Sequence, residues 1–191
     1  MEHPSQNPHA LLQSAPVIAA VRKPGELDAA CASGAEILFL LHAEVSDLAQ
    51  TVGRAKDAGK CVFLHFDLIE GLSEDAAALR FVKRNTAADG IISTRTGVIR
   101  TAKEMGFHTV QRFFVVDSQA EETVLRTVPS SQPDFIELMP GLITPVIRRL
   151  ADVLTVPVIA GGLIETKAQI VELLSAGASG VSVGKRELWN V

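Results

Sequence analysis

Two glycine corners near the end of the chain are the residues best suited to holding an anion. Gly161 and Gly162 follow one short apolar run, and Gly184 follows the next run and precedes Lys185. Glycine has no side chain to cover its backbone N–H groups, and such groups at a turn or helix start attract phosphate oxygens. Lys185 adds a full positive charge. The spacing predicts a phosphate site, and the alternative is that these glycines only form tight turns.

Four polar side chains after two earlier apolar runs have the chemistry to meet the remaining groups of such a ligand. His65 and Asp67 lie two residues apart and are expected on one face of a strand, because side chains alternate there. Ser93 ends the next run, and Arg95 follows it by two residues. A histidine beside a carboxylate can transfer protons, and it can equally hydrogen-bond the hydroxyls of a polyol. Both roles stay open.

A further candidate pair lies inside two neighbouring runs. Glu137 has apolar neighbours, where a carboxylate needs a partner, and Arg112 in the preceding run is the candidate. The pair is either a buried structural ion pair or a ligand contact. No lysine lies in the runs between 37 and 160, so a Schiff-base nucleophile is missing, and no His/Cys spacing indicates a metal. We therefore expect no catalytic residue, no metal and no cofactor, and a protein that is not an enzyme.

Eight short apolar runs must position these residues. Each run is followed by a segment of helical period or, after the last, a short helical turn, and several helices end in glycine, as at Gly59 and Gly106. The runs are 17–21, 37–41, 61–66, 90–93, 109–116, 134–139, 156–160 and 180–183. Runs without polar alternation are typical of parallel strands buried on both faces. We predict an α/β fold, a single compact TIM (β/α)₈ barrel over 16–191 after an N-terminal tail over 1–15. An open doubly wound sheet uses the same units, but eight even units without GxGxxG after the first run favour closure.

The composition limits the kinds of partner that the chain can be expected to bind. The 191 residues are 47% hydrophobic and carry a net charge of −4, with no block of like charge. This argues against strong non-specific binding to nucleic acid. No apolar stretch reaches about 18 residues, and the N-terminus lacks the apolar core of a signal peptide, so we expect a cytoplasmic protein without membrane contact.

Six segments together resemble the glycerol-3-phosphate-responsive antiterminator family, over about 16–189. They read LHFDLIEGL at 64–72, GIISTR at 90–95, QRFFVVDS at 111–118, PDFIELMPG at 133–141, PVIAGGLI at 157–164 and LW at 188–189. The resemblance implies a regulator of glycerol utilisation that senses glycerol 3-phosphate as its effector, binds leader mRNA and prevents premature transcription termination. A homo-oligomer is a further possibility. Neither composition nor spacing indicates RNA binding.

The surface that would contact RNA is open at this level. Candidate cations lie on three expected helices, and the alternative for each is a solvated helix face. They are Arg80, Lys83 and Arg84, Arg100 and Lys103, and Arg148 and Arg149. No aromatic side chain is expected among them to stack on bases. Two other functions remain: a TIM-barrel enzyme acting on a glycerol-phosphate-like substrate, such as a prenyl transferase, and a phosphate-binding barrel without chemistry or RNA partner.

Overall fold

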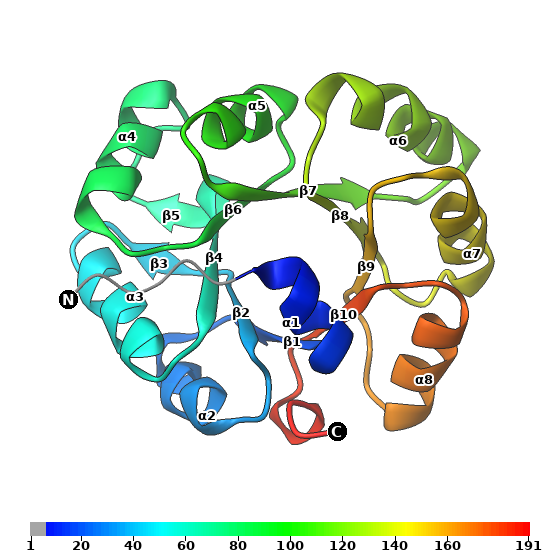
Figure 1. The fold of residues 1–191 in the computed structure, drawn as a ribbon, viewed down its shortest axis with the longest axis horizontal. Helices are drawn as coiled ribbons and strands as arrows, with labels where there is room; N and C mark the ends of the chain where they lie inside the picture. Colours follow the sequence, from blue (N-terminus) through cyan, green and yellow to red (C-terminus); the bar gives the residue numbers. More distant parts are fainter. Residues whose placement is uncertain (1–6) are drawn as a thin grey trace.

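Eight parallel strands form a closed barrel in the computed structural model, which describes residues 7–191 (Figure 1). Around the barrel the strands follow the order β1-β10-β9-β8-β7-β6-β4-β2, and β1 pairs directly with β10. They are β1 (Val17–Val21), β2 (Ile37–Leu40), β4 (Cys61–His65), β6 (Gly90–Ser93), β7 (His108–Phe114), β8 (Phe135–Met139), β9 (Val158–Gly161) and β10 (Gly180–Val183). Closure excludes the open sheet and confirms the predicted TIM barrel.

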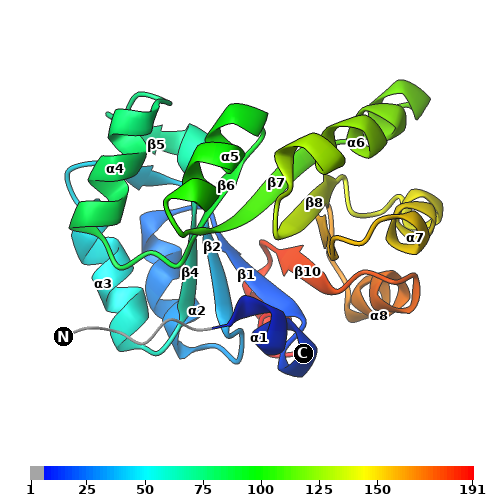
Figure 2. The ribbon, with the colours of Figure 1, turned by 45° about the horizontal axis from the view of Figure 1, so that its top comes forward.

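Seven helices surround the barrel, and each covers the strands beside it (Figures 1 and 2). They are α2 (Leu27–Ala32), α3 (Leu48–Asp57), α4 (Ala76–Asn85), α5 (Thr96–Glu104), α6 (Ser118–Ser131), α7 (Thr144–Val153) and α8 (Lys167–Ser175). Short 3₁₀ turns lie at η1 (Pro24–Glu26), η2 (Phe66–Leu68) and η3 (Arg186–Leu188), and the last follows β10 in place of an eighth helix. Two two-residue strands that were not predicted, β3 (Ala43–Glu44) and β5 (Ile69–Glu70), pair with each other beside the barrel.

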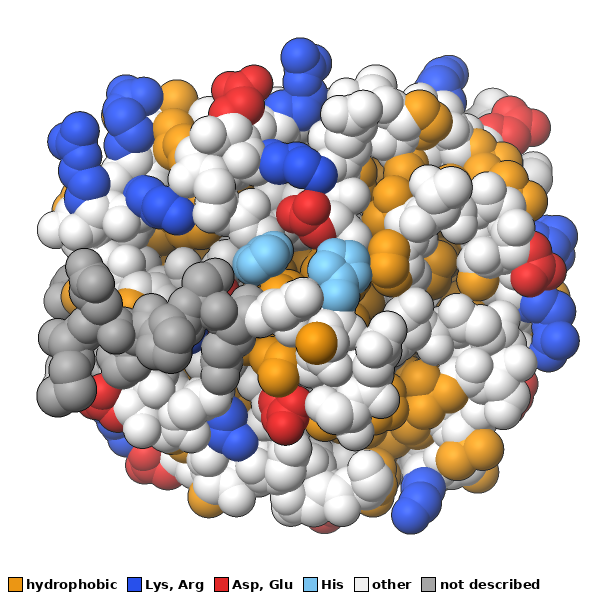
Figure 3. Space-filling model, in the orientation of Figure 1, with side chains coloured by type: hydrophobic (Ala, Val, Ile, Leu, Met, Phe, Trp, Pro, Cys, Tyr) orange, Lys and Arg blue, Asp and Glu red, His pale blue; other side chains and the backbone are white. Residues whose placement is uncertain are grey.

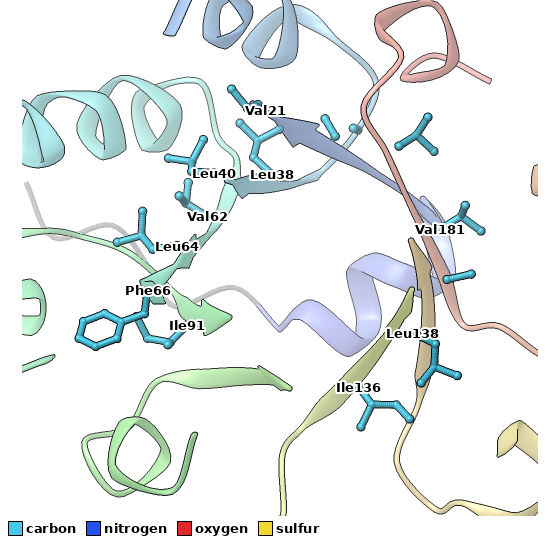
Figure 4. Close-up of a cluster of buried hydrophobic side chains, with 14 of the residues drawn as sticks. Val21, Leu38, Leu40, Val62, Leu64, Phe66, Ile91, Ile136, Leu138 and Val181 are labelled. Atoms are coloured by element: carbon cyan, nitrogen blue, oxygen red, sulfur yellow. The ribbon is translucent and has the colours of Figure 1, made fainter. Parts of the chain in front are cut away.

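Two apolar layers hold the fold together, because the barrel strands are buried on both faces. The outer layer lies between strands and helices, with Leu38, Leu64 and Leu138 pointing outward from their strands (Figure 4). The inner layer fills the lower half of the barrel, where Phe39 and Phe63 pack with ring centroids 5.6 Å apart. Apolar side chains fill the lower half of the barrel. The polar side chains that face the interior therefore lie in the upper half, at the carboxyl ends of the strands.

The segment predicted as an N-terminal tail is partly helical. Residues 1–6 of that prediction lie outside the described residues. Pro8–Ser14 form helix α1, which lies across the amino ends of the strands and closes the bottom of the barrel (Figure 2). Leu12 packs into the inner layer, and the His9 ring stacks on Phe135 with centroids 4.2 Å apart. Within residues 7–191 no helix is long and apolar enough to cross a membrane.

Candidate ligand-binding site

A cavity of about 760 Å³ opens at the carboxyl ends of the strands, opposite α1. Its volume is within the range of small-molecule sites. It is lined by residues at or just after the ends of β1, β2, β7, β8, β9 and β10: Ala20, Arg22, Leu41, Arg112, Phe114, Glu137, Met139, Pro140, Gly162, Leu163, Ile164, Glu165, Ser182, Gly184 and Lys185. The cavity therefore brings together three residues of the expected phosphate set and two of the expected polyol set.

A buried polar network forms the floor of this cavity. The Nε of Arg112 donates to Oε2 of Glu137 at 2.6 Å, and the hydroxyl of Ser182 donates to Oε1 of the same carboxylate at 2.6 Å. Glu137 is 1% exposed and Arg112 is 6% exposed. The predicted Arg112–Glu137 ion pair is thus present. Both carboxylate oxygens are bonded, so the side chain of Glu137 is held in a fixed orientation.

Gly161 makes room for that network. A Cβ at this position would lie 2.4 Å from Oε1 of Glu137 and 2.6 Å from the hydroxyl of Ser182. Such separations are too short for non-bonded atoms, so any larger residue would displace the carboxylate. Gly161 is not among the residues that line the cavity. Its direct structural role is to leave space for the floor.

The two remaining glycine corners lie on the rim. Gly162 has φ +80°, a conformation that side chains rarely adopt, and its carbonyl accepts from the amide of Gly141 at 3.1 Å. At Gly184 the missing Cβ leaves room for the guanidinium of Arg22, whose Nη2 donates to the Gly184 carbonyl at 3.2 Å. Within residues 7–191 the amides of Gly162 and Gly184 donate to no protein acceptor. Both are available to an anion.

Two cations flank these amides. Arg22 lies over Gly184, and Nζ of Lys185 donates to the carbonyl of Glu165 at 3.2 Å, which ties the end of β10 to the loop after β9. Neither is within ion-pair distance of a carboxylate in the described part of the chain. A dianion at this rim would therefore meet two uncompensated positive charges and two free amides.

His65 lies deeper in the barrel wall, on β4. It is 4% exposed, and its Nδ1 has no hydrogen-bond partner. Burial, with the Arg112 charge as a second cause, lowers the pKa of the imidazole to about 4, and Asp67 opposes the shift in part. His65 is therefore neutral at pH 7. A neutral ring with a free nitrogen can accept a hydrogen bond from a hydroxyl group.

Asp67, Ser93 and Arg95 lie away from the cavity. Strand β4 ends at His65, one residue earlier than predicted, and Asp67 sits in the turn η2 rather than on the same strand face. Its carboxylate accepts from the hydroxyl of Ser93 at 2.5 Å and from the amide and hydroxyl of Thr94 at 2.8 and 2.9 Å. Arg95 forms an ion pair with Glu74. These residues fasten the η2 turn to the start of α5.

Among the lining residues that were not predicted as site residues, Arg22 and Ser182 form side-chain hydrogen bonds to other residues of the cavity. Arg22 directly follows β1, and it reaches Gly184 because barrel closure places β1 beside β10. Ser182 precedes Gly184 by two residues, so its side chain faces the barrel interior with Glu137. Both residues lie within two positions of the end of a strand. In a closed barrel, polar side chains at such positions meet at the carboxyl rim, and this would have identified them.

The cavity offers anion binding and hydroxyl recognition. Among residues 7–191 no group of three His, Cys, Asp or Glu side chains gathers as a metal site would require. Glu137 is committed to Arg112 and Ser182, and His65 is the buried titratable group left with an open hydrogen-bond position. A ligand with a phosphate at one end and hydroxyls at the other would satisfy the rim and the floor together.

Known proteins resemble this chain over more than nine-tenths of its length. A protein from Escherichia coli (strain K12), the uncharacterized protein YgcP, is 34% identical over 181 residues, which is 95% of each chain. The crystal structure of the glycerol uptake operon antiterminator regulatory protein from Listeria monocytogenes superposes with a TM-score of 0.88 at 34% identity, covering 99% of this chain and 98% of that one. A glycerol uptake operon antiterminator-related protein from Thermotoga maritima gives a TM-score of 0.81 at 33% identity, covering 91% and 96%.

The family comparison agrees with these relatives and with the segments quoted above. The model described as glycerol-3-phosphate responsive antiterminator matches residues 17–189, from the first barrel strand to the buried Trp189. This chain belongs to the glycerol-3-phosphate responsive antiterminator family.

Proposed function

We propose that the chain is a cytoplasmic sensor of glycerol 3-phosphate that regulates glycerol-utilisation genes by binding leader mRNA and preventing transcription termination. The observation that carries the sensor role is the rim of the cavity, where free amides of Gly162 and Gly184 lie beside Arg22 and Lys185. Backbone amides with two flanking cations suit a phosphate dianion. The family supplies the regulatory output.

The floor of the cavity supports a ligand with hydroxyl groups. Glu137 and Ser182 hold oxygen atoms at a fixed place below the rim, and Arg112 has guanidinium nitrogens beyond the Nε that bonds Glu137. A polyol hydroxyl can both donate to a carboxylate and accept from a guanidinium. Glycerol 3-phosphate has two hydroxyls next to its phosphate, so it would engage both levels of the site.

Binding affects RNA only if the ligand favours one conformation of the protein over another. Coupling free energies between two sites are typically 1–3 kcal/mol, which corresponds to about 5- to 150-fold in affinity. We expect the ligand to raise RNA affinity by a factor in that range.

Two measurements test the proposal. Isothermal titration compares glycerol 3-phosphate with glycerol and with inorganic phosphate, and we expect glycerol 3-phosphate to bind most tightly because only it reaches rim and floor. A gel-shift titration then uses the leader transcript of the glycerol-utilisation operon from the same genome, with and without saturating ligand. The same RNA affinity in both conditions would refute the switch, and absence of heat with glycerol 3-phosphate would refute the sensor.

A further inference from the structure

Positive charge is concentrated on two neighbouring helices. Helices α4 and α5 pack against each other and carry five cations with one carboxylate, Glu104, although the chain as a whole is at −4. The cations are exposed, and we call them the basic surface: Arg80, Lys83, Arg84, Arg100 and Lys103. Lys and Arg side chains gather over α4 and α5 in the space-filling view (Figure 3). The acidic remainder of the chain makes this the side that attracts a polyanion.

Three arginines of the basic surface are available to a partner. In the part of the chain that the structure describes, no carboxylate lies within ion-pair distance of Arg80, Arg84 or Arg100. The two lysines are used within the fold. Lys83 lies 4.4 Å above the Phe107 ring, and Lys103 bonds Asp134 at 2.9 Å. Guanidinium groups suit phosphate oxygens because their planar donors match two oxygens at once.

An aromatic side chain and a cavity accompany these charges. Phe81 is 39% exposed, follows Arg80 directly and lies on the same helix as Arg84, which corrects the expectation that no aromatic side chain interleaves the cations. An open cavity of about 520 Å³ lies between the ends of α5 and α6, lined by Arg100, Lys103, Glu104 and residues 129–132. Single-stranded nucleic acids are bound by cations along the backbone and by aromatic rings that stack on bases.

We propose that the basic surface is the RNA-binding surface of this protein, with single-stranded RNA lying across α4 and α5 toward the cavity beside α6. This inference rests on the proposed function. The arginines hold the backbone phosphates, and Phe81 stacks on one base. The surface runs from the middle of α4 and α5, at Arg80 and Arg100, to their last turns, whereas the ligand cavity opens at the carboxyl ends of the strands.

The test neutralises the three arginines that have no carboxylate partner and compares this variant with a control that loses the same charge elsewhere. Arg80→Gln/Arg84→Gln/Arg100→Gln is measured beside Arg126→Gln/Arg148→Gln/Lys167→Gln, which removes the same charge from exposed positions on α6, α7 and α8. Binding of the fluorescein-labelled leader transcript is followed by anisotropy from about 0.05 to 0.3 M salt, with saturating glycerol 3-phosphate. Three lost phosphate contacts lower the slope of log K against log[salt] by about 2, which weakens binding about 100-fold at 0.1 M salt.

A second variant separates stacking from charge. Phe81→Ala should weaken RNA binding by about tenfold without changing the salt slope, because base stacking on an aromatic ring contributes about 1–3 kcal/mol. Titration with glycerol 3-phosphate should give the wild-type affinity for all three variants, since none of the substituted residues lines the ligand cavity.

The outcomes are distinct. In one outcome the α4–α5 variant keeps the RNA affinity and salt slope of the wild-type protein, and the wild-type protein binds RNA in a ligand-dependent way. This result would overturn the assignment of RNA binding to the basic surface and leave the proposed function standing. Equal losses in the α4–α5 variant and the matched variant would also overturn it. If the wild-type protein binds no RNA with or without ligand, the proposed function fails and the surface fails with it.

Discussion

Replacing Glu137 by glutamine should destabilise the barrel by about 3–5 kcal/mol, because it leaves the Arg112 guanidinium buried without its counter-charge. The Arg112–Glu137 bond is 2.6 Å long and both side chains are almost fully buried, so water on the cavity side would replace the carboxylate only in part. Glutamine keeps the size of the side chain; its oxygen can accept from Arg112 while its amide donates to the Ser182 hydroxyl, so the main loss is the charge. The loss is a large part of the 5–15 kcal/mol that typically stabilises a domain.

Urea unfolding at pH 7 measures this loss. The chain has one tryptophan, and Trp189 is 2% exposed, so its fluorescence should report unfolding directly. With a slope of about 2 kcal/mol per molar urea, the midpoint should fall by about 1.5–2.5 M. The control is Glu121→Gln, which removes the same charge from an ion pair with Arg149, a side chain that is 57% exposed. That change should cost less than about 1 kcal/mol. Equal losses in the two variants would refute the reasoning.

Three further changes test the rim and the buried histidine. Gly162→Ala should weaken glycerol 3-phosphate binding at least about tenfold in a calorimetric titration, since the φ of Gly162 is +80° and the new Cβ would lie 2.7 Å from Cε of Met139. The control is Gly59→Ala. Gly59 has φ +77° with no atom within 4 Å of an added Cβ, so this change should leave binding unchanged. Arg22→Gln should weaken glycerol 3-phosphate and inorganic phosphate by the same factor, about tenfold, and an effect on one ligand alone would place the phosphate elsewhere. The pKa of His65 is near 4 in the folded chain and about 6.5 when unfolded, so the unfolded state takes up the proton first as pH falls, and stability should drop by about 3 kcal/mol between pH 7 and pH 4. His65→Leu should remove that part of the pH dependence in urea unfolding, and an unchanged pH profile would contradict it.

The strands could be predicted because a parallel barrel buries both faces of each strand. The runs at 17–21, 90–93 and 180–183 coincide with β1, β6 and β10, and the other runs match their strands to within two residues at each end. Helix α1 could not be predicted in this way. Its buried residues Pro8 and Leu12 pack against the bottom of the barrel, which forms only when the barrel closes. The pair β3 and β5 has two residues in each strand, too few for any periodic pattern.

The floor of the site could be predicted, and the rim only in part. Glu137 and Arg112 lie in neighbouring strands and pair in register, so a carboxylate among apolar residues pointed to its partner. Asp67 shows the limit of the alternation rule. Its direction depends on where β4 ends, and the strand ends at His65, which turns the carboxylate toward Ser93. Arg22 reaches the rim because β1 pairs with β10, and these two strands lie at opposite ends of the sequence. No short segment of the sequence predicts that contact.

The two proposed ligands bind at different parts of the barrel, so coupling between them needs an element that reaches both. Helix α5 does so. It starts beside Thr94, which Asp67 holds through both its amide and its hydroxyl, and it carries Arg100 of the basic surface. Asp67 follows His65 by two residues, and His65 senses the charge of Arg112 at the floor of the cavity. We therefore expect a ligand that changes the hydrogen bonding at Arg112 to act on the turn before α5. Three hydrogen bonds join that turn to the carboxylate of Asp67, so Asp67→Asn should weaken the dependence of RNA affinity on the ligand, and an unchanged dependence would exclude this route.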